Sequence, residues 1–148
     1  MNNRTFYNEI LTEHNMNPLH KHELDGPVKM LRGVNPSCGD DITLKIKVSE
    51  DGIIEEGAFI GDGCAISQAS ADMMIDLILG RKVEEALRLK DIFINMILGK
   101  ASEEEIQELE EASSLQDISH MPARVKCAVL GWHTLEEMFE KKDEKSDD

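Results

Sequence analysis

The 148-residue chain lacks long apolar runs, and none approaches the roughly 18 residues that a membrane-spanning helix requires. Its first residues also lack the basic start, apolar stretch and small-residue cleavage site of a secretory signal. We therefore expect a cytoplasmic protein that contacts no membrane.

Positive charge is also scarce. Lysine and arginine together number 16, against 30 aspartate and glutamate residues, which gives a net charge of −14. Such a chain repels the phosphate backbone of nucleic acids, so we expect neither DNA nor RNA as a partner. The expected partners are proteins with basic faces.

Cysteine occurs only three times, at Cys38, Cys64 and Cys127. An odd number of cysteines in a reducing compartment argues against a disulfide framework and favours metal binding or thiol chemistry. A chain of 148 residues can form a hydrophobic core without such crosslinks. A metal ion here therefore need not be structural.

The hydrophobic pattern predicts an α+β fold. Apolar and polar residues alternate over 42–48, and the pattern resumes over 53–60 after Asp51-Gly52, which is typical of an antiparallel hairpin. A further strand is expected over 28–34. Helices are expected around Phe6 to Leu11, over 65–79, over 83–98, over about 102–111, and through Cys127 to Glu140. The prediction is a three-stranded antiparallel sheet packed against helices, in a single domain of residues 1–140. The charged and polar tail, 141–148, is expected to be disordered.

Each cysteine falls at the end of a predicted element. Cys38 lies in a Pro/Gly loop between two strands, Cys64 lies where a strand meets a helix, and Cys127 lies near the start of the last helix. Element ends can converge on one site, and a helix N-terminus favours the thiolate at Cys64 and Cys127. With Asp40, two residues after Cys38, the three thiols form a complete ligand set for a tetrahedral zinc ion.

The spacing alone supports this metal site only weakly, because the three cysteines lie far apart in the sequence. The alternative is that Cys64 and Cys127 are ordinary small residues of the core. Three glycines, Gly39, Gly61 and Gly63, would let the backbone turn tightly beside the sulfur atoms.

The other conspicuous residues indicate no site. The five histidines do not cluster as metal ligands, and we expect most of them at the surface; they are His14, His20, His22, His120 and His133. Trp132, in the last predicted helix, is expected in the core.

Three segments resemble the signature blocks of the IscU/NifU N-terminal family of iron-sulfur cluster assembly proteins. They are Asn35-Pro36-x-Cys38-Gly39-Asp40, Gly61-x-Gly63-Cys64-Ala65-Ile66-Ser67-x-Ala69-Ser70 and Arg124-x-x-Cys127-x-x-Leu130-x-Trp132. They occur in order, and the match covers nearly the whole chain. The chain is more similar to the SufU branch, because Lys126 stands where IscU-type scaffolds carry a histidine. The acidic stretch 103–111 also resembles the SufU insertion.

This resemblance implies a zinc-dependent sulfurtransferase that accepts persulfide sulfur from a SufS-type cysteine desulfurase and acts with downstream cluster assembly proteins. It implies four zinc ligands, which are Cys38, Asp40, Cys64 and Cys127, and it makes Cys38 the acceptor nucleophile. A desulfurase side chain that replaced Cys38 on the zinc would free its thiolate for attack on the persulfide. Arg124 and Lys126 would stabilise thiolate charge or contact the partner, unless they are simply solvated charges.

Two other functions fit the same four residues. One is a scaffold that assembles a [2Fe-2S] cluster on these ligands, since three cysteines and a carboxylate can hold either metal. The other is a structural zinc module, because four protein ligands are typical of a closed structural site.

Overall fold

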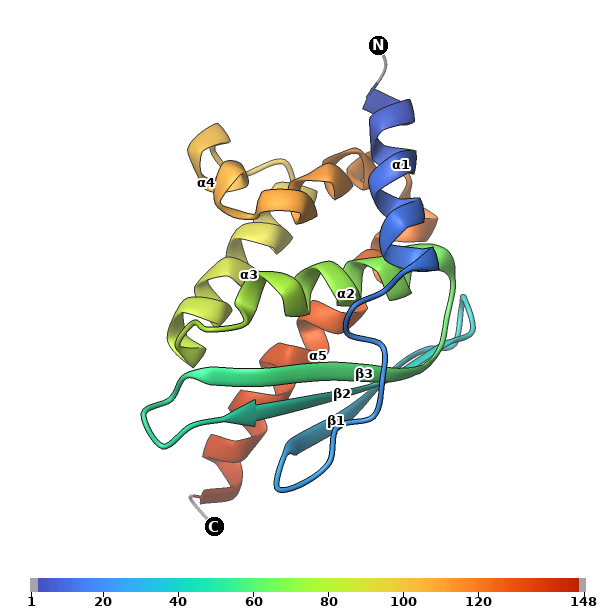
Figure 1. Cartoon of the computed structure of the whole chain (residues 1–148). Helices are drawn as coiled ribbons and strands as arrows, with labels where there is room; N and C mark the ends of the chain where they lie inside the picture. The colour runs from blue at the N-terminus through green and yellow to red at the C-terminus, as the bar shows by residue number, and fades with distance from the viewer. Residues whose placement is uncertain (1–2, 147–148) are drawn as a thin grey trace.

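The computed structural model describes the backbone of residues 3–146 and the side chains of residues 9–140. Its elements are α1 (Asn3–Met16), β1 (Lys29–Asn35), β2 (Asp40–Val48), β3 (Ile54–Asp62), α2 (Ala65–Ile78), α3 (Val83–Ile97), α4 (Glu103–Glu108), the 3₁₀ helix η1 (Glu110–His120) and α5 (Pro122–Ser146). The strands form one antiparallel sheet in the order β1-β2-β3, with the helices packed against it (Figure 1). The predicted α+β fold is confirmed. None of the described helices is long and apolar enough to cross a membrane.

The alternating pattern of β2 separates the two faces of the sheet. Ile42, Leu44 and Ile46 are buried on the inner face, and the residues between them are partly exposed. β2 and β3 are joined by the expected Asp51-Gly52 turn, in which the amide N–H of Gly52 donates to the carbonyl oxygen of Ser49 at 3.0 Å. The hairpin prediction is therefore confirmed.

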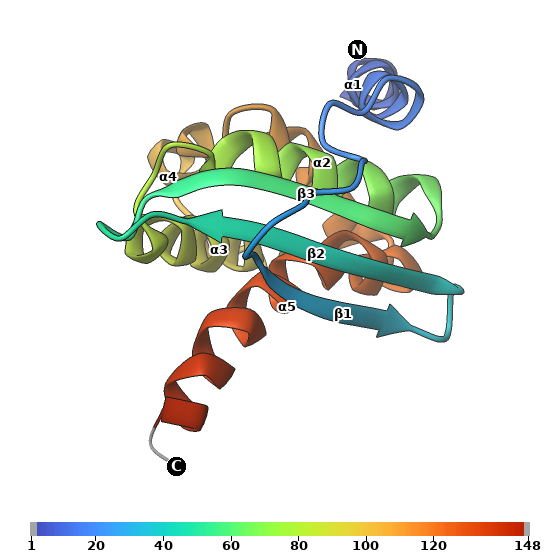
Figure 2. The same cartoon turned by 60° about the horizontal axis from the view of Figure 1, so that its bottom comes forward.

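The helices α2 and α5 cover the inner face of the sheet (Figure 2). α2 packs against β3, α5 packs against β1 and β2, and α3 packs in turn on α5. Trp132 of α5 stacks on Phe93 of α3 with ring centroids 4.2 Å apart, and both rings are fully buried. The expectation that Trp132 belongs to the core is confirmed.

The segment after α3 differs from the single helix expected over about 102–111. α4 begins with the capping box of Ser102 and Glu105 but is only six residues long, and η1 follows it. The buried residues of η1 are Ala112, Leu115 and Ile118, three positions apart. This spacing fits a 3₁₀ helix, which has three residues per turn, and explains why its apolar face does not follow the α-helical repeat.

α5 is longer than expected from the sequence, since its backbone is helical from Pro122 to Ser146. The predicted tail, 141–148, overlaps its last part. The side chains of 141–148 and the backbone of 147–148 lie outside the described residues, so disorder of the tail stays a prediction. The single-domain organisation of residues 1–140 also stays a prediction.

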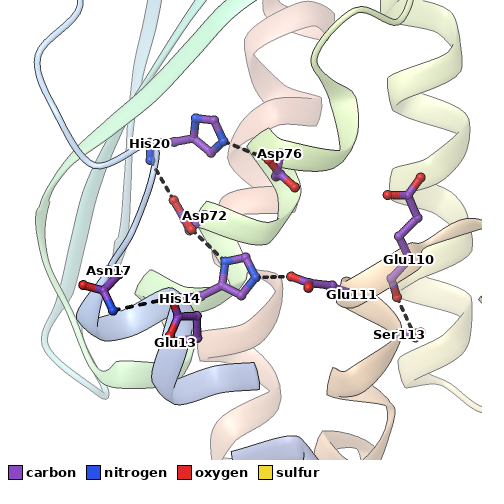
Figure 3. A network of polar contacts seen from close by, with 9 residues as sticks. All are labelled: Glu13, His14, Asn17, His20, Asp72, Asp76, Glu110, Glu111 and Ser113. Carbon is purple, nitrogen blue, oxygen red and sulfur yellow. Dashed lines mark hydrogen bonds and ion pairs between the residues drawn. The ribbon is translucent and has the colours of Figure 1, made fainter. Parts of the chain in front are cut away.

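A polar cluster joins α1 to α2 and η1 (Figure 3). His14 of α1 is buried, and its Nδ1 lies 2.7 Å from Oδ2 of Asp72, while its Nε2 contacts Glu111. The other oxygen of Asp72 accepts the backbone N–H of His20 at 2.9 Å. The hydrogen bond to Asp72, aided by the one to Glu111, raises the pKa of His14 to about 9, although burial acts in the opposite direction. The expectation that most histidines lie at the surface does not extend to His14, whose acidic partners are supplied by distant segments.

Candidate metal centre

Several segments far apart in the sequence meet at one end of the sheet. The loop between β1 and β2 carries Cys38, and Asp40 is the first residue of β2. Cys64 caps α2 immediately after β3, and Cys127 lies on α5. A carboxylate oxygen of Asp40 and the sulfur atoms of Cys38 and Cys127 all lie within 4.8 Å of one another. Three of the four predicted ligands therefore form one cluster.

Cys64, the fourth predicted ligand, stands beside this cluster. Its sulfur accepts a hydrogen bond from the backbone N–H of Ser67 at 3.5 Å, as the cap of α2. It still lies close enough to Cys127 to help raise the pKa of that thiol. The structure thus places Cys64 at the rim of the cluster, with its sulfur turned to the helix N-terminus.

The carboxylate of Asp40 is 1% exposed, and both of its oxygens accept hydrogen bonds. Oδ1 accepts the backbone N–H of Cys64 at 2.8 Å and the hydroxyl of Ser67 at 3.0 Å. Oδ2 accepts the side-chain amide of Asn35 at 3.2 Å. Because a buried carboxylate is costly without donors, these three contacts hold Asp40 in place and orient its oxygens.

Two of the expected glycines are required by close approach. A Cβ on Gly63 would lie 2.5 Å from Oγ of Ser67 and 2.9 Å from Oδ1 of Asp40. Gly61 has a φ of +120°, and a Cβ there would lie 2.1 Å from the carbonyl oxygen of Asp41. The third, Gly39, has open space around it and is favoured only by its φ of +74°.

Cys127 does not behave as the sequence predicts. It lies near the start of α5, in the second turn, as expected, but it is fully buried. Burial, followed by hydrogen bonds with Cys38 and Cys64, raises the pKa of Cys127. The expectation that the helix N-terminus favours a thiolate here is therefore wrong, and a bound cation would be needed to deprotonate this sulfur at neutral pH.

Cys38 is partly exposed on its loop, unlike Cys127. Its thiol donates to the carbonyl oxygen of Ala123 at 3.8 Å. Its backbone N–H donates to the carbonyl oxygen of Asn35 at 3.2 Å, which closes the loop. Cys38 therefore combines a held backbone with a sulfur that a partner protein can reach.

The two predicted cations have different surroundings. The pKa of Arg124 is raised most by its electrostatic interaction with Cys64, then by its hydrogen bond and electrostatic interaction with Cys127, and least by Cys38. Its guanidinium is therefore near enough to interact with all three cysteines. Lys126 is exposed and makes no hydrogen bond or ion pair with any residue that the structure describes. Arg124 alone is placed to stabilise thiolate charge.

The donor set fits a thiophilic metal ion. Three cysteine sulfurs with one carboxylate oxygen suit tetrahedral zinc, and the same donors can hold an iron-sulfur cluster. The burial of Asp40 and Cys127 supports this fit, because their negative charges need a cation when both are ionised.

Sequence reasoning assigned no role to Asn35 or Ser67, which both contact Asp40. Both lie inside the segments that carry the family resemblance. Their polar side chains next to predicted ligands were the available signal, but only the fold shows that they point at the carboxylate.

Comparisons with known proteins agree with this fold. Residues 6–146 match the family described as NifU-like N terminal domain. The chain is 42% identical over 135 residues to the iron-sulfur cluster assembly scaffold protein IscU of Streptococcus pyogenes, covering 91% of this chain and 83% of that protein. It is 40% identical over 139 residues to the zinc-dependent sulfurtransferase SufU of Bacillus subtilis, covering 94% of this chain and 92% of that protein.

A solved structure from Fervidobacterium islandicum, of a protein assigned as an iron-sulfur cluster assembly scaffold for the SUF system, is also similar. It superposes with a TM-score of 0.81 at 36% identity, covering 86% of this chain and 92% of that chain. With its three signature blocks, its sheet and its cysteine and aspartate cluster, the chain belongs to the NifU-like N-terminal domain family of iron-sulfur cluster assembly proteins.

Proposed function

We propose that this protein is a zinc-dependent sulfurtransferase that accepts persulfide sulfur from a cysteine desulfurase for iron-sulfur cluster assembly. The observation that carries the proposal is that the three sulfur atoms differ in burial and in position. Cys127 is fully buried, whereas Cys38 and Cys64 are both partly exposed; the sulfur of Cys64 is held as the cap of α2, and Cys38 lies on a loop. The similarity to a relative named as a zinc-dependent sulfurtransferase supports the same role.

Cys38, Asp40, Cys64 and Cys127 would hold the zinc ion. When bound, zinc keeps cysteine thiols deprotonated at neutral pH. Among these ligands the Asp40 carboxylate is harder than a thiolate and therefore exchanges more readily. Arg124 lies beside the sulfur atoms and offsets part of their negative charge.

The proposed transfer is a thiol exchange. The thiolate of Cys38 attacks the terminal sulfur of the desulfurase persulfide, and a new sulfur-sulfur bond forms. The old sulfur-sulfur bond breaks, and its electron pair leaves with the desulfurase cysteine as a thiolate. Cys38 thereby becomes the persulfide without net oxidation or reduction. We expect a SufS-type desulfurase as the donor, and downstream cluster assembly proteins as the next acceptors.

A scaffold function is the second candidate. The relative from Streptococcus pyogenes is named as a scaffold, and the same donor set could assemble a [2Fe-2S] cluster as cargo. Lys126, which replaces the histidine of IscU-type scaffolds, favours the sulfurtransferase instead.

Metal content and desulfurase turnover test the proposal. The protein is purified with and without oxygen, its zinc and iron are measured, and desulfurase turnover is followed with the wild type and Cys38→Ala. Ser37→Ala, in the same loop, is the matched control. We expect about one zinc ion per chain, and stimulation of turnover that Ser37→Ala keeps and Cys38→Ala loses. Stimulation by Cys38→Ala would refute the acceptor role, and iron with sulfide in place of zinc would favour the scaffold.

A further inference from the structure

Asn35 touches three of the four candidate ligands. It is the last residue of β1 and is 7% exposed. Its carbonyl oxygen accepts the backbone N–H of Cys38 at 3.2 Å. Its side-chain nitrogen Nδ2 lies 3.2 Å from Oδ2 of Asp40 and 3.8 Å from Sγ of Cys127. Asn35 therefore connects a strand end, a loop and a helix at the site.

The chemistry of the two neighbours determines how the Asn35 amide is oriented. An ionised carboxylate and a thiolate can only accept hydrogen bonds, so the nitrogen of the amide must face them rather than its oxygen. One amide group carries two N–H bonds, which allows it to donate to Asp40 and to Cys127 at once. These are charge-assisted hydrogen bonds, which are stronger than those between neutral groups.

We propose that Asn35 is a positioning residue of the metal centre, which holds the Asp40 carboxylate and the Cys127 sulfur in a fixed relation and withdraws charge from that sulfur. This inference rests on the proposed function, because it requires a metal ion on these ligands. Outer partners of this kind orient the ligand atoms and tune their donor strength.

Ser67 provides an internal comparison. Its hydroxyl donates to Oδ1 of Asp40 at 3.0 Å and also lies 3.0 Å from the carbonyl oxygen of Cys64. Its side chain makes no hydrogen bond to a sulfur atom among the described residues. Ser67 therefore supports the carboxylate alone, whereas Asn35 supports the carboxylate and a thiolate.

The test compares Asn35→Leu, Ser67→Ala and Asn17→Ala with the wild type. Leucine has nearly the shape of asparagine but no donor, and Asn17 is an exposed asparagine whose one hydrogen-bond partner among the described residues is Glu13. Zinc affinity is measured by competition with a chelator, and the centre is probed with Co²⁺. We expect zinc affinity to fall roughly 10-fold to 100-fold in Asn35→Leu and in Ser67→Ala, and to stay unchanged in Asn17→Ala.

The Co²⁺ spectrum separates positioning from a general loss of stability. Without the Asn35 donor the Cys127 sulfur is richer in electrons, so the sulfur-to-cobalt charge-transfer band should move to lower energy in Asn35→Leu. It should not move in Ser67→Ala. Asn35→Ala is the second variant if Asn35→Leu does not fold, as judged by circular dichroism.

Three results would overturn the inference. Wild-type zinc affinity together with a wild-type cobalt spectrum in the Asn35 variant would overturn this inference but not the proposed function. An equal band shift in Ser67→Ala would do the same. Failure of the wild type to bind zinc or Co²⁺ would overturn the proposed function and this inference with it.

Discussion

The backbone amide of Cys64 donates a hydrogen bond to Oδ1 of Asp40 at 2.8 Å, although the two residues lie 24 positions apart in the sequence. This contact joins the first residue of β2 to the cap of α2. The position of the carboxylate therefore depends on the turn that leads from β3 into α2, and that turn contains Gly63.

Gly63→Ala should disrupt the site, because the added methyl group would lie 2.9 Å from Oδ1 of Asp40 and 2.5 Å from Oγ of Ser67. We expect a loss of about 1–3 kcal/mol in unfolding free energy, together with weaker zinc binding. Denaturant unfolding and chelator competition measure the two effects.

Gly131→Ala is the matched control for Gly63→Ala. A Cβ on Gly131 would make only ordinary contacts, the nearest at 3.4 Å from Ala71, and alanine favours a helix interior by about 1 kcal/mol over glycine. It should be neutral or slightly stabilising, and equal losses in both variants would contradict the steric argument.

Arg124→Gln should slow alkylation of Cys38 by iodoacetamide in the metal-free protein, roughly threefold to tenfold. The pKa of Arg124 is raised by the neighbouring cysteines, so its replacement removes a positive charge near the Cys38 loop. Mass spectrometry locates the alkylated cysteine. In Lys126→Gln, Cys38 should react at the wild-type rate, since Lys126 makes no hydrogen bond or ion pair with a described residue. Slower alkylation in both variants would mean that net charge alone, and not the position of Arg124, controls the reactivity of Cys38.

His14 should make stability depend on pH in a predictable direction. Its pKa is about 9 in the folded protein, above the usual 6.5, so its stabilising contribution is complete below pH 6.5 and is lost as the pH rises through 9. The wild type should have a larger unfolding free energy than His14→Ala at pH 6. We expect this difference to be about 1–3 kcal/mol larger at pH 6 than at pH 10. Denaturant unfolding of the metal-free proteins at both pH values measures this difference.

Among the described residues, the acidic groups near His14 include Asp72, Glu111, Glu110 and Asp76, of which Asp72 and Glu111 bond it directly (Figure 3). His22→Ala is the control, because His22 is exposed and its ring bonds, within the part of the chain that the structure describes, only the carbonyl oxygen of Glu23. A pH-dependent difference for His22→Ala equal to that for His14→Ala would contradict the assignment.

Removal of zinc should lower the melting temperature. A ligand present at about 1,000 times its dissociation constant stabilises a protein by about 4 kcal/mol, which corresponds to roughly 10 °C for a chain of this size. The measurement is a thermal melt with and without a chelator. The melting temperature of Asp40→Ala should change much less when the chelator is added. Identical melting temperatures of the chelated and the zinc-loaded wild type would show that zinc is not bound at a stabilising site.

Local patterns predicted much of the fold because they act within a few residues. The alternation over Ile42 to Val48 fixed one face of β2, and the Asp51-Gly52 pair identified the hairpin. The 3₁₀ helix η1 was not predicted, since its apolar residues repeat every third position and give no sustained α-helical stripe.

The sequence by itself determined the strands, most of the helices and the identity of four candidate donors, because motif residues and hydrophobic periodicity are local. Only the tertiary structure decided how unequal those donors are. It placed Cys64 as a cap, buried Cys127, left Cys38 within reach of solvent and set Asn35 between two of the donors. The physical reason is that burial and hydrogen bonding depend on partners from distant segments, such as Asn35 and Cys127, 92 positions apart.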